Sequence, residues 1–291
     1  MDLLALFFSA YPYAFPGLAA VLGLMVGSFL NVVIYRLPVM MHRNWRQECA
    51  NYLKIEQAAD AEEALNLVFP LSRCPSCKTP IKPYQNIPVV SYLLLKGRCA
   101  SCQTRISPRY PAIEALTAVL SVIVACHFGY SVQTVFALGL TWALVALSFI
   151  DIDHQLLPDS ITLPALWVGL LLSLAGVFTD SHDSIIGAAA GYLCLWSVYQ
   201  LFKLATGKEG MGYGDFKLLA LFGAWLGWQM LPVIVLLSSL VGAVIGITQI
   251  VLGKRDRNVP IPFGPYLAIA GWLAMLWGSK LNQFYLASAG L

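Results

Sequence analysis

The chain has 291 residues, of which 58% are apolar and only 11% are charged, and its mean hydropathy is +0.71. A soluble protein carries about 25% charged residues, so this composition excludes an ordinary soluble domain and indicates a membrane protein. The formal net charge of +3 does not predict a nucleic-acid partner, because the basic residues orient the chain in the lipid bilayer, as their positions show below.

Apolar stretches long enough to cross a bilayer, roughly 17–25 residues each, recur along most of the chain. The sequence therefore predicts an all-α polytopic membrane protein with about eight transmembrane helices and a small insert between the first two. The start of the chain has no basic region and no small-residue cleavage site, so we expect the first span to remain as an anchor. The expected spans are Tyr13–Ile34, Ala112–Phe128, Thr134–Ile150, Ile161–Phe178, Ile185–Leu204, Phe216–Trp228, Leu231–Leu252 and Tyr266–Trp277.

The positive charges fix an orientation for these spans. Eleven of the 18 Lys and Arg residues lie between Arg36 and Arg109, and smaller groups flank Asp215 and fill a turn at 253–258. With this number of spans, all three groups fall on one side of the bilayer, and positive charge collects on the cytoplasmic side. We therefore expect both termini outside the cytoplasm, and the loops around the acidic residues inside it.

The segment after the first span changes character and becomes polar, basic and rich in proline. It divides the chain into a first transmembrane helix (1–35), a cytoplasmic insert (36–110) and a membrane core (111–291) of about seven helices. An acidic, alanine-rich stretch at 56–65 is compatible with a short amphipathic helix. The insert offers few large apolar residues for a core, and domains this small often need a disulfide or a metal ion for stability.

Four cysteines of the insert form two C-x-x-C pairs: Cys74, Cys77, Cys99 and Cys102. Each pair can form a tight turn that points two thiolates at one ion, and two turns complete a tetrahedral zinc site. Disulfides are the alternative, but they are rare in the reducing cytoplasm. We predict one structural zinc ion, because four thiolates leave no open position for a catalytic water.

Two aspartates, Asp151 and Asp215, stand where apolar spans end. A carboxylate beside lipid is expensive, so such residues are usually functional. Paired carboxylates can share a proton, one acting as acid and the other as base, and can then activate water against a peptide bond. Asp215 follows Gly212 and Gly214, whose bare backbone can align an extended peptide beside the acid and can adopt positive φ.

The acidic residues and the glycines also have alternative roles. Asp151 belongs to a segment with Asp153 and Asp159, for which solvated turn or helix-cap roles are the alternative. The glycines around Asp215 match nucleotide-binding loops only loosely, because that fingerprint follows a β-strand, whereas a membrane span precedes this segment. No H-E-x-x-H motif occurs in the sequence, so zinc-dependent proteolysis has no ligand set. Glu114, an acid one turn into the second span, has pairing with a nearby Lys or Arg as its structural alternative.

Several motifs together resemble a known family. They are Gly27-Ser28-Phe29-Leu30-Asn31 with Arg36-Leu37-Pro38, the two C-x-x-C pairs, Asn86-Ile87-Pro88, Asp151 ahead of Leu157-Pro158-Asp159, and Gly212-Tyr213-Gly214-Asp215-Phe216-Lys217. In combination they resemble the bacterial type IV prepilin leader peptidase/N-methyltransferase family. The likeness runs from the first span to the Pro262-Phe263-Gly264-Pro265 segment, and so covers nearly the whole chain.

The resemblance implies a bifunctional enzyme of the bacterial inner membrane. Family members cut the basic leader from type IV prepilins and type II secretion pseudopilins on the cytoplasmic side, after a glycine. They then methylate the new N-terminal residue, usually phenylalanine, with S-adenosylmethionine. The family's catalytic aspartates map onto Asp151 and Asp215. For methyl transfer we select Gly97, Arg98 and Glu114 from their place in the family-like region; Glu114 would hold the sulfonium of the donor or the amine of the substrate.

The expected mechanism places a water molecule between Asp151 and Asp215, while the hydrophobic stem of the substrate enters laterally from the lipid. Two close carboxylates do not both ionise easily, so we expect the pair to share a proton. One alternative is a proton-coupled transporter that uses the same aspartates as a relay, with acids near the bilayer centre. Another is a non-enzymatic assembly scaffold, in which both aspartates are dispensable. The sequence does not specify an oligomeric state.

Overall fold

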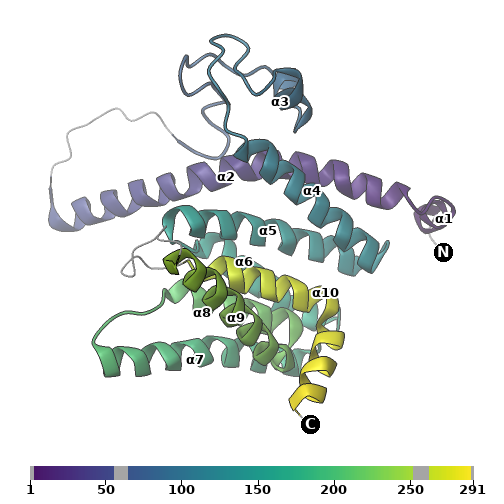
Figure 1. The fold of residues 1–291 in the computed structure, drawn as a ribbon, viewed down its shortest axis with the longest axis vertical. Helices are drawn as coiled ribbons and strands as arrows, with labels where there is room; N and C mark the ends of the chain where they lie inside the picture. The colour runs from purple at the N-terminus through teal and green to yellow at the C-terminus, as the bar shows by residue number, and fades with distance from the viewer. Residues whose placement is uncertain (1–2, 56–64, 252–261, 290–291) are drawn as a thin grey trace. The chain divides into compact units, whose positions relative to one another are not determined.

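The computed structural model describes residues 3–55, 65–251 and 262–289 (Figure 1). These residues form helices and loops, and no β-strand occurs among them, so the predicted all-α class is confirmed. The expected amphipathic helix at 56–65, apart from Leu65, and the basic turn at 253–258 lie outside the described residues. The chain divides into two compact units, Met1–Thr134 and Val135–Leu291.

Among the described residues, five helical segments are long and apolar enough to cross a bilayer, and each overlaps one of the expected spans. They are Ala14–Leu53, Arg109–Phe128, Val132–His154, Ser181–Thr206 and Trp228–Thr248. A shorter apolar helix, Asp159–Ser173, coincides with the start of another expected span. The structure thus supports a polytopic membrane protein, and the total of about eight spans stays a prediction.

The first unit is built on two packed helices. Its elements are α1 (Leu3–Ala10), α2 (Ala14–Leu53), the short helix η1 (Pro83–Asn86), α3 (Val90–Leu94) and α4 (Arg109–Phe128). Helices α2 and α4 lie side by side (Figure 1). A Cβ atom at Gly23 would lie 2.7 Å from the Cα of Ala118, and one at Gly27 would lie 2.8 Å from the Cα of Glu114. The two glycines therefore permit close contact of these helices, as expected for small-residue pairs in membranes.

Helix α2 is longer than the expected first span. It continues past Ile34 through the buried Pro38 and ends at Leu53, followed by Lys54 with φ +53°. Forty residues of helix span about 60 Å, twice the hydrocarbon thickness of about 30 Å, so the polar segment after the first span begins as a helix. The residues after Pro38 contain neither glycine nor proline before the helix ends, so no local signal stops the helix earlier.

The second unit contains α5 (Val132–His154, which starts at the unit boundary), α6 (Asp159–Ser173), α7 (Ser181–Thr206), α8 (Tyr213–Leu226), η2 (Trp228–Met230), α9 (Leu231–Val251) and α10 (Gly264–Ala289). Helix α8 is its centre, because every residue from Asp215 to Trp225 except Lys217 is buried. A helix that is apolar on all sides is buried on all sides. Gly187 of α7 contacts Gly223 of α8 backbone to backbone, which brings the two helices together.

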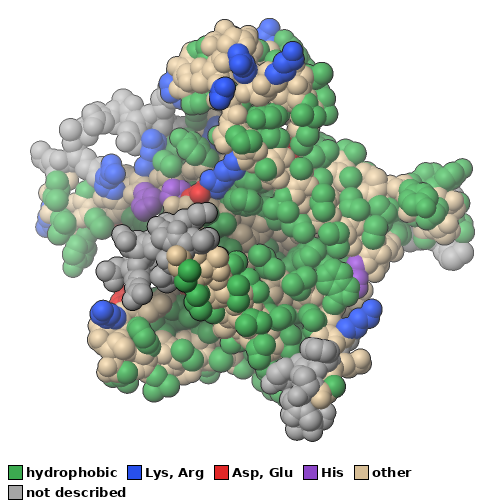
Figure 2. All heavy atoms as spheres, in the orientation of Figure 1, with side chains coloured by type: hydrophobic (Ala, Val, Ile, Leu, Met, Phe, Trp, Pro, Cys, Tyr) green, Lys and Arg blue, Asp and Glu red, His purple; other side chains and the backbone are tan. Residues whose placement is uncertain are grey.

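The surface matches a membrane protein with a basic insert. Figure 2 shows hydrophobic side chains over most of the visible helical surface, whereas Lys and Arg gather over the loops around α3. Helix α10 runs past the expected end of its span, but its regular geometry breaks at Trp277, the residue at which we expected the span to end.

Candidate active site, metal centre and methyl-donor cavity

Asp151 lies in the last turn of α5 and is only 6% exposed. Its Oδ2 accepts a hydrogen bond of 3.0 Å from the backbone N–H of Gly264, the first residue of α10. The first N–H groups of a helix have no partner within that helix. The carboxylate of Asp151 therefore caps α10, at the end where the helix dipole is positive.

Asp215 is also buried, with 7% of its surface exposed, and it lies in the first turn of α8. Gly212 is the N-cap of this helix, and its carbonyl accepts the N–H of Asp215 at 3.2 Å. Gly214, the residue before Asp215, packs against Leu157, and so does Gly264, whose N–H binds Asp151, so the two acids belong to one packed cluster. The structure brings the two predicted acids together: Asp215 lies in the first turn of α8, and Asp151, at the end of α5, binds the first N–H of α10.

Leu157 packs against two glycines, and each of these glycines lies beside one of the two carboxylates. A Cβ atom at Gly214 would lie 2.7 Å from the Cβ of Leu157, and one at Gly264 would lie 3.1 Å from its Cδ2. The same Cβ at Gly264 would lie 2.7 Å from Oδ2 of Asp151. Contacts this short leave no room for a side chain, so both positions need glycine for close approach.

Gly212 differs from these two glycines. A Cβ atom at Gly212 would meet only Oδ2 of Asp215 within 4 Å, at 3.7 Å, so there is free space beside that carboxylate. Gly212 has φ −80°, and Gly214 is not among the described residues with positive φ. Positive φ, which glycine at these positions would have allowed, is therefore not used here.

Sequence reasoning missed Gly264 and Leu157 as parts of this site. Both occur in motifs that carried the family resemblance, but no property of the residue types assigned them a contact with Asp151. The available signal was Pro265, since proline near the start of an apolar stretch marks a helix N-terminus with free N–H groups. Which carboxylate caps that terminus depends on the tertiary fold.

Two ion pairs lie near the start of α8. Lys217 Nζ lies 2.7 Å from both carboxylate oxygens of Asp159 and links α8 to α6. Asp159 does not cap α6 with its side chain, since it is the first residue of that helix. Lys203 Nζ lies 2.8 Å from Glu209, and this hydrogen bond holds the pKa of Glu209 below its ordinary value.

An apolar pocket of about 310 Å³ adjoins the start of α10. It is lined by Ser239, Gly242, Ala243, Phe263 and Tyr266, of which the last two flank Gly264 and Pro265. The pocket is therefore close in sequence to the backbone group that holds Asp151.

The two C-x-x-C pairs form the same turn twice. The N–H of Cys74 donates to the carbonyl of Thr79 at 3.0 Å, and the N–H of Cys99 donates to the carbonyl of Thr104 at 2.9 Å. In both turns the residue after the second cysteine has φ +59°. The repeat of backbone geometry directs both pairs of sulfur atoms to one place.

The four sulfur atoms suit a tetrahedral ion. They lie within 4.8 Å of one another, and Sγ of Cys74 is 3.8 Å from Sγ of Cys102. Ligands at a Zn–S distance of about 2.3 Å in a tetrahedron are about 3.8 Å apart. The hydroxyl of Thr104 lies 3.2 Å from Sγ of Cys102, and interactions with this residue lower the pKa of Cys102 to about 6. Thr79 lowers the pKa of Cys77 in the same way, so both thiols lose their protons more easily than an ordinary cysteine, which favours metal binding.

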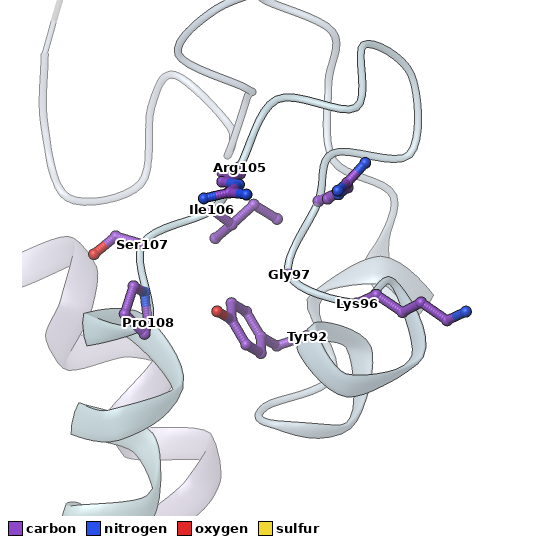
Figure 3. A pocket seen from close by; sticks show the side chains of 8 residues that line it. Tyr92, Lys96, Gly97, Arg105, Ile106, Ser107 and Pro108 are labelled. Atoms are coloured by element: carbon purple, nitrogen blue, oxygen red, sulfur yellow. The ribbon is translucent and has the colours of Figure 1, made fainter.

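A cavity of about 580 Å³ lies beside the second cysteine turn (Figure 3). Its lining residues are Tyr92, Lys96, Gly97, Arg98, Arg105, Ile106, Ser107 and Pro108. Gly97 has φ +66°, and a Cβ atom there would lie 2.9 Å from the Cζ atom of the Tyr92 ring. Two of the residues selected for methyl transfer thus meet at one cavity, whereas Glu114 is not among its lining residues.

Two family models match this chain. The model of the bacterial peptidase A24 N-terminal domain matches residues 21–128, and that of the type IV leader peptidase family matches residues 138–247. A prepilin leader peptidase/N-methyltransferase of Stutzerimonas stutzeri is 55% identical over 285 residues, 98% of each chain. The relatives of the same name from Pseudomonas aeruginosa (54%, 98% of each chain) and Aeromonas hydrophila (56%, 95% of this chain and 96% of the relative) are equally similar.

The chain belongs to the type IV leader peptidase family. The resemblance drawn from the motifs is therefore confirmed. No solved structure matches the chain.

The matched ranges separate the two sites of this leader peptidase. Residues 138–247 contain Asp151 and Asp215, whereas residues 21–128 contain the four cysteines and Glu114. Gly264 lies beyond both ranges but within the length shared with the relatives. The structure thus shows that Asp151 contacts a residue, Gly264, that lies outside the range matched by the family model.

Proposed function

We propose that this peptidase removes the basic leader from type IV prepilins and type II secretion pseudopilins, and then methylates the new N-terminal amine with S-adenosylmethionine. It is an aspartic endopeptidase and an N-methyltransferase, as the relatives' names and the family support. The observation that carries the peptidase assignment is the buried pair Asp151 and Asp215 at the starts of α10 and α8. The transporter alternative has no support in the family models or the relatives.

The cleavage step uses one ionised and one protonated aspartate. The ionised member of Asp151 and Asp215 takes a proton from water as the water oxygen attacks the carbonyl carbon of the scissile bond. The protonated member donates its hydrogen bond to the carbonyl oxygen. When the tetrahedral intermediate collapses, the C–N bond breaks and the departing nitrogen takes up the proton that the first aspartate accepted from water, so the pair returns to one ionised and one protonated member. The N-termini of α8 and α10 stabilise the single negative charge of the pair.

The glycines of the loop have separate roles in this proposal. The open space at Gly212 admits the extended backbone of the substrate beside Asp215. Gly214 keeps the loop against Leu157 and so holds Asp215 near Asp151. The apolar pocket at Phe263 receives hydrophobic side chains that follow the scissile bond.

The proposed topology follows the charge distribution. The protein lies in the bacterial inner membrane with about eight spans, both termini in the periplasm and the carboxylate pair on the cytoplasmic side. The chain is organised as a first helix (1–35), a cytoplasmic insert (36–110) and a membrane core (111–291). The basic insert then stays on the side where the leader of the substrate is cut.

One zinc ion, held by Cys74, Cys77, Cys99 and Cys102, is proposed to stabilise the insert. The clustering of the four sulfur atoms and the lowered pKa values of Cys77 and Cys102 fit this ion. Its role is structural, because a site of four thiolates keeps no position for water or substrate.

Methyl transfer is proposed to occur at the cavity beside the second cysteine turn. Arg98 and Arg105 offer positive charge for the carboxylate of S-adenosylmethionine, and the ring of Tyr92 offers a face for its adenine. The volume of about 580 Å³ is within the usual range for cofactor sites. Gly97 leaves room for the Tyr92 ring, and Glu114 supports the reaction from outside the cavity.

Product masses test the proposal as a whole. Purified protein is incubated with a prepilin, with and without S-adenosylmethionine, and the products are weighed by mass spectrometry. We expect loss of the leader in both reactions and gain of one methyl group only with the donor. An intact prepilin in both reactions would refute the peptidase and leave the scaffold alternative, in which the aspartates have no role.

A further inference from the structure

Glu114 is a buried carboxylate whose partners are known. It lies near the start of α4 and is 8% exposed. Its Oε2 accepts a hydrogen bond of 2.7 Å from the backbone N–H of Val89, and the side chain of Ser28 on α2 also interacts with the carboxyl group. Since buried carboxylates require such partners, these contacts account for the burial of Glu114 without any bound ligand.

Val89, the residue that Glu114 holds, has an unusual backbone conformation. Its φ and ψ are +60° and −49°, and the N–H of Val90 donates to the carbonyl of Pro88 at 2.6 Å. These values define a γ-turn of the rare form with positive φ at its centre. That region is least favourable for a β-branched residue, and such conformations persist only where the surroundings hold them. The hydrogen bond to Glu114 is a direct contact that holds this one.

The γ-turn stands at the start of one wall of the methyl-donor cavity. Val89 is the N-cap of α3, and α3 with the turn after it supplies the wall that contains Tyr92 and residues 96–98. The opposite wall, residues 105–108, runs directly into α4 (Figure 3). Helix α4 thus carries one wall through the chain itself and holds the other through Glu114.

We propose that Glu114 is a positioning residue for methyl transfer: by fixing the γ-turn at Val89 it sets the distance between the two walls of the cavity. The proposal rests on the proposed methyl transfer at this cavity. It assigns Glu114 a role in which the carboxylate oxygen acts as a hydrogen-bond acceptor, and contact with the sulfonium or the amine is not required.

Two substitutions separate this role from a charge effect. Glu114→Gln keeps an oxygen that can accept the N–H of Val89 but removes the negative charge, whereas Glu114→Ala removes both. We expect Glu114→Gln to keep the KM for S-adenosylmethionine within about 3-fold of the unsubstituted protein, and Glu114→Ala to raise it at least about 10-fold. Cleavage of prepilin should be unchanged in both, which also reports that they fold. Equal loss of methylation in the two variants would overturn the proposal.

Hydrogen exchange tests the contact without any reaction. Amide protection of peptides covering residues 84–95 is expected to fall in Glu114→Ala and to persist in Glu114→Gln. Leu116→Ala, an exposed residue of the same helix, serves as the control and should change neither exchange nor KM. Unchanged protection in Glu114→Ala would also refute the proposal. If the unsubstituted protein cleaves but does not methylate, the methyl-transfer function fails, whereas the exchange result still decides whether Glu114 holds the turn.

A second, independent test replaces Val89 with a residue that adopts positive φ more easily. Val89→Gly allows positive φ without steric cost, so it should restore part of the affinity for S-adenosylmethionine to Glu114→Ala. A double variant no better than Glu114→Ala would contradict the proposal. If Glu114→Ala does not fold, Ser28→Ala removes only the interaction from α2 and is expected to raise the KM for S-adenosylmethionine by a smaller factor.

Discussion

The carboxylate pair and the cysteine insert position their reactive groups by opposite means. Asp151 and Asp215 are buried, and both lie against a helix N-terminus: Asp215 in the first turn of α8, and Asp151 bound to the first N–H of α10. The cysteines lie in loops, two of the four are exposed, and their arrangement depends on backbone turns and on shared sulfur ligands. One site is held by packing in the membrane unit, whereas the other is proposed to be held by a metal ion.

This difference predicts which changes each activity can tolerate. Close backbone contacts leave no room for an added atom but need no ligand, so the carboxylate pair should be sensitive to changes of glycine and insensitive to loss of metal. The insert should show the reverse behaviour. The two activities should therefore separate under substitution, and each experiment below tests a part of that separation.

The largest effect is expected at the aspartates themselves. Asp151→Asn and Asp215→Asn preserve shape but remove the groups that share a proton, so leader release should fall at least about 10³-fold in each. Asp153→Asn, on the same helix as Asp151, is the control and should keep activity within a few-fold. Methylation of a pilin that has already been cleaved should persist in all three. Full cleavage by either of the first two variants would refute the paired mechanism.

The next largest effect is expected at Gly264. A methyl group there would lie 2.7 Å from Oδ2 of Asp151, so Gly264→Ala must displace the carboxylate or the start of α10. We expect cleavage to fall about 100-fold or more, since small misplacements of catalytic groups are costly. Gly139→Ala is the matched control, because a Cβ atom at Gly139 would meet nothing within 4 Å. Equal activity of the two variants would show that the contact with Gly264 does not position Asp151.

The sequence predicted the reactive groups better than the contacts that place them. Asp151, Asp215 and the cysteines were selected because charge beside lipid and C-x-x-C spacing have few purely structural causes. Gly264 was not assigned to the site, since its contact joins residues 113 positions apart and depends on how α5 and α10 pack. The turn at Val89 was equally hidden, because its sequence favours an extended backbone at that position.

In the fold too, the sequence predicted the positions of apolar spans better than the ends of the helices. The apolar spans were found from composition, but α2 continues to Leu53 because no glycine or proline stops it after Pro38. A membrane span ends where the apolar residues end, whereas a helix can continue beyond that point, as α2 does. Hydropathy reports only the first of them.

Loss of the metal site should affect methylation more than cleavage. Cys102→Ser removes one of the four proposed ligands, and the cavity adjoins that turn, so we expect methylation to fall about 10-fold or more while cleavage stays within a few-fold. Zinc content per chain, measured by mass spectrometry of the metal, should fall in parallel. Cys194→Ser, which lies outside the cluster, is the control. Equal loss of both activities would mean that the insert supports the carboxylate pair as well.

The smallest effect is expected at the ion pair between Lys217 and Asp159. The pair joins α8 to α6 at 2.7 Å, but the carboxylate is 53% exposed, and exposed ion pairs contribute at most about 1 kcal/mol. Lys217→Met should therefore lower the thermal midpoint in detergent by only about 2–4 °C and leave cleavage within about 3-fold. Lys203→Met breaks the more exposed pair with Glu209 and should have a smaller effect still. A loss of cleavage in Lys217→Met comparable to that of Gly264→Ala would show that a side-chain charge, and not backbone packing alone, holds Asp215 in place.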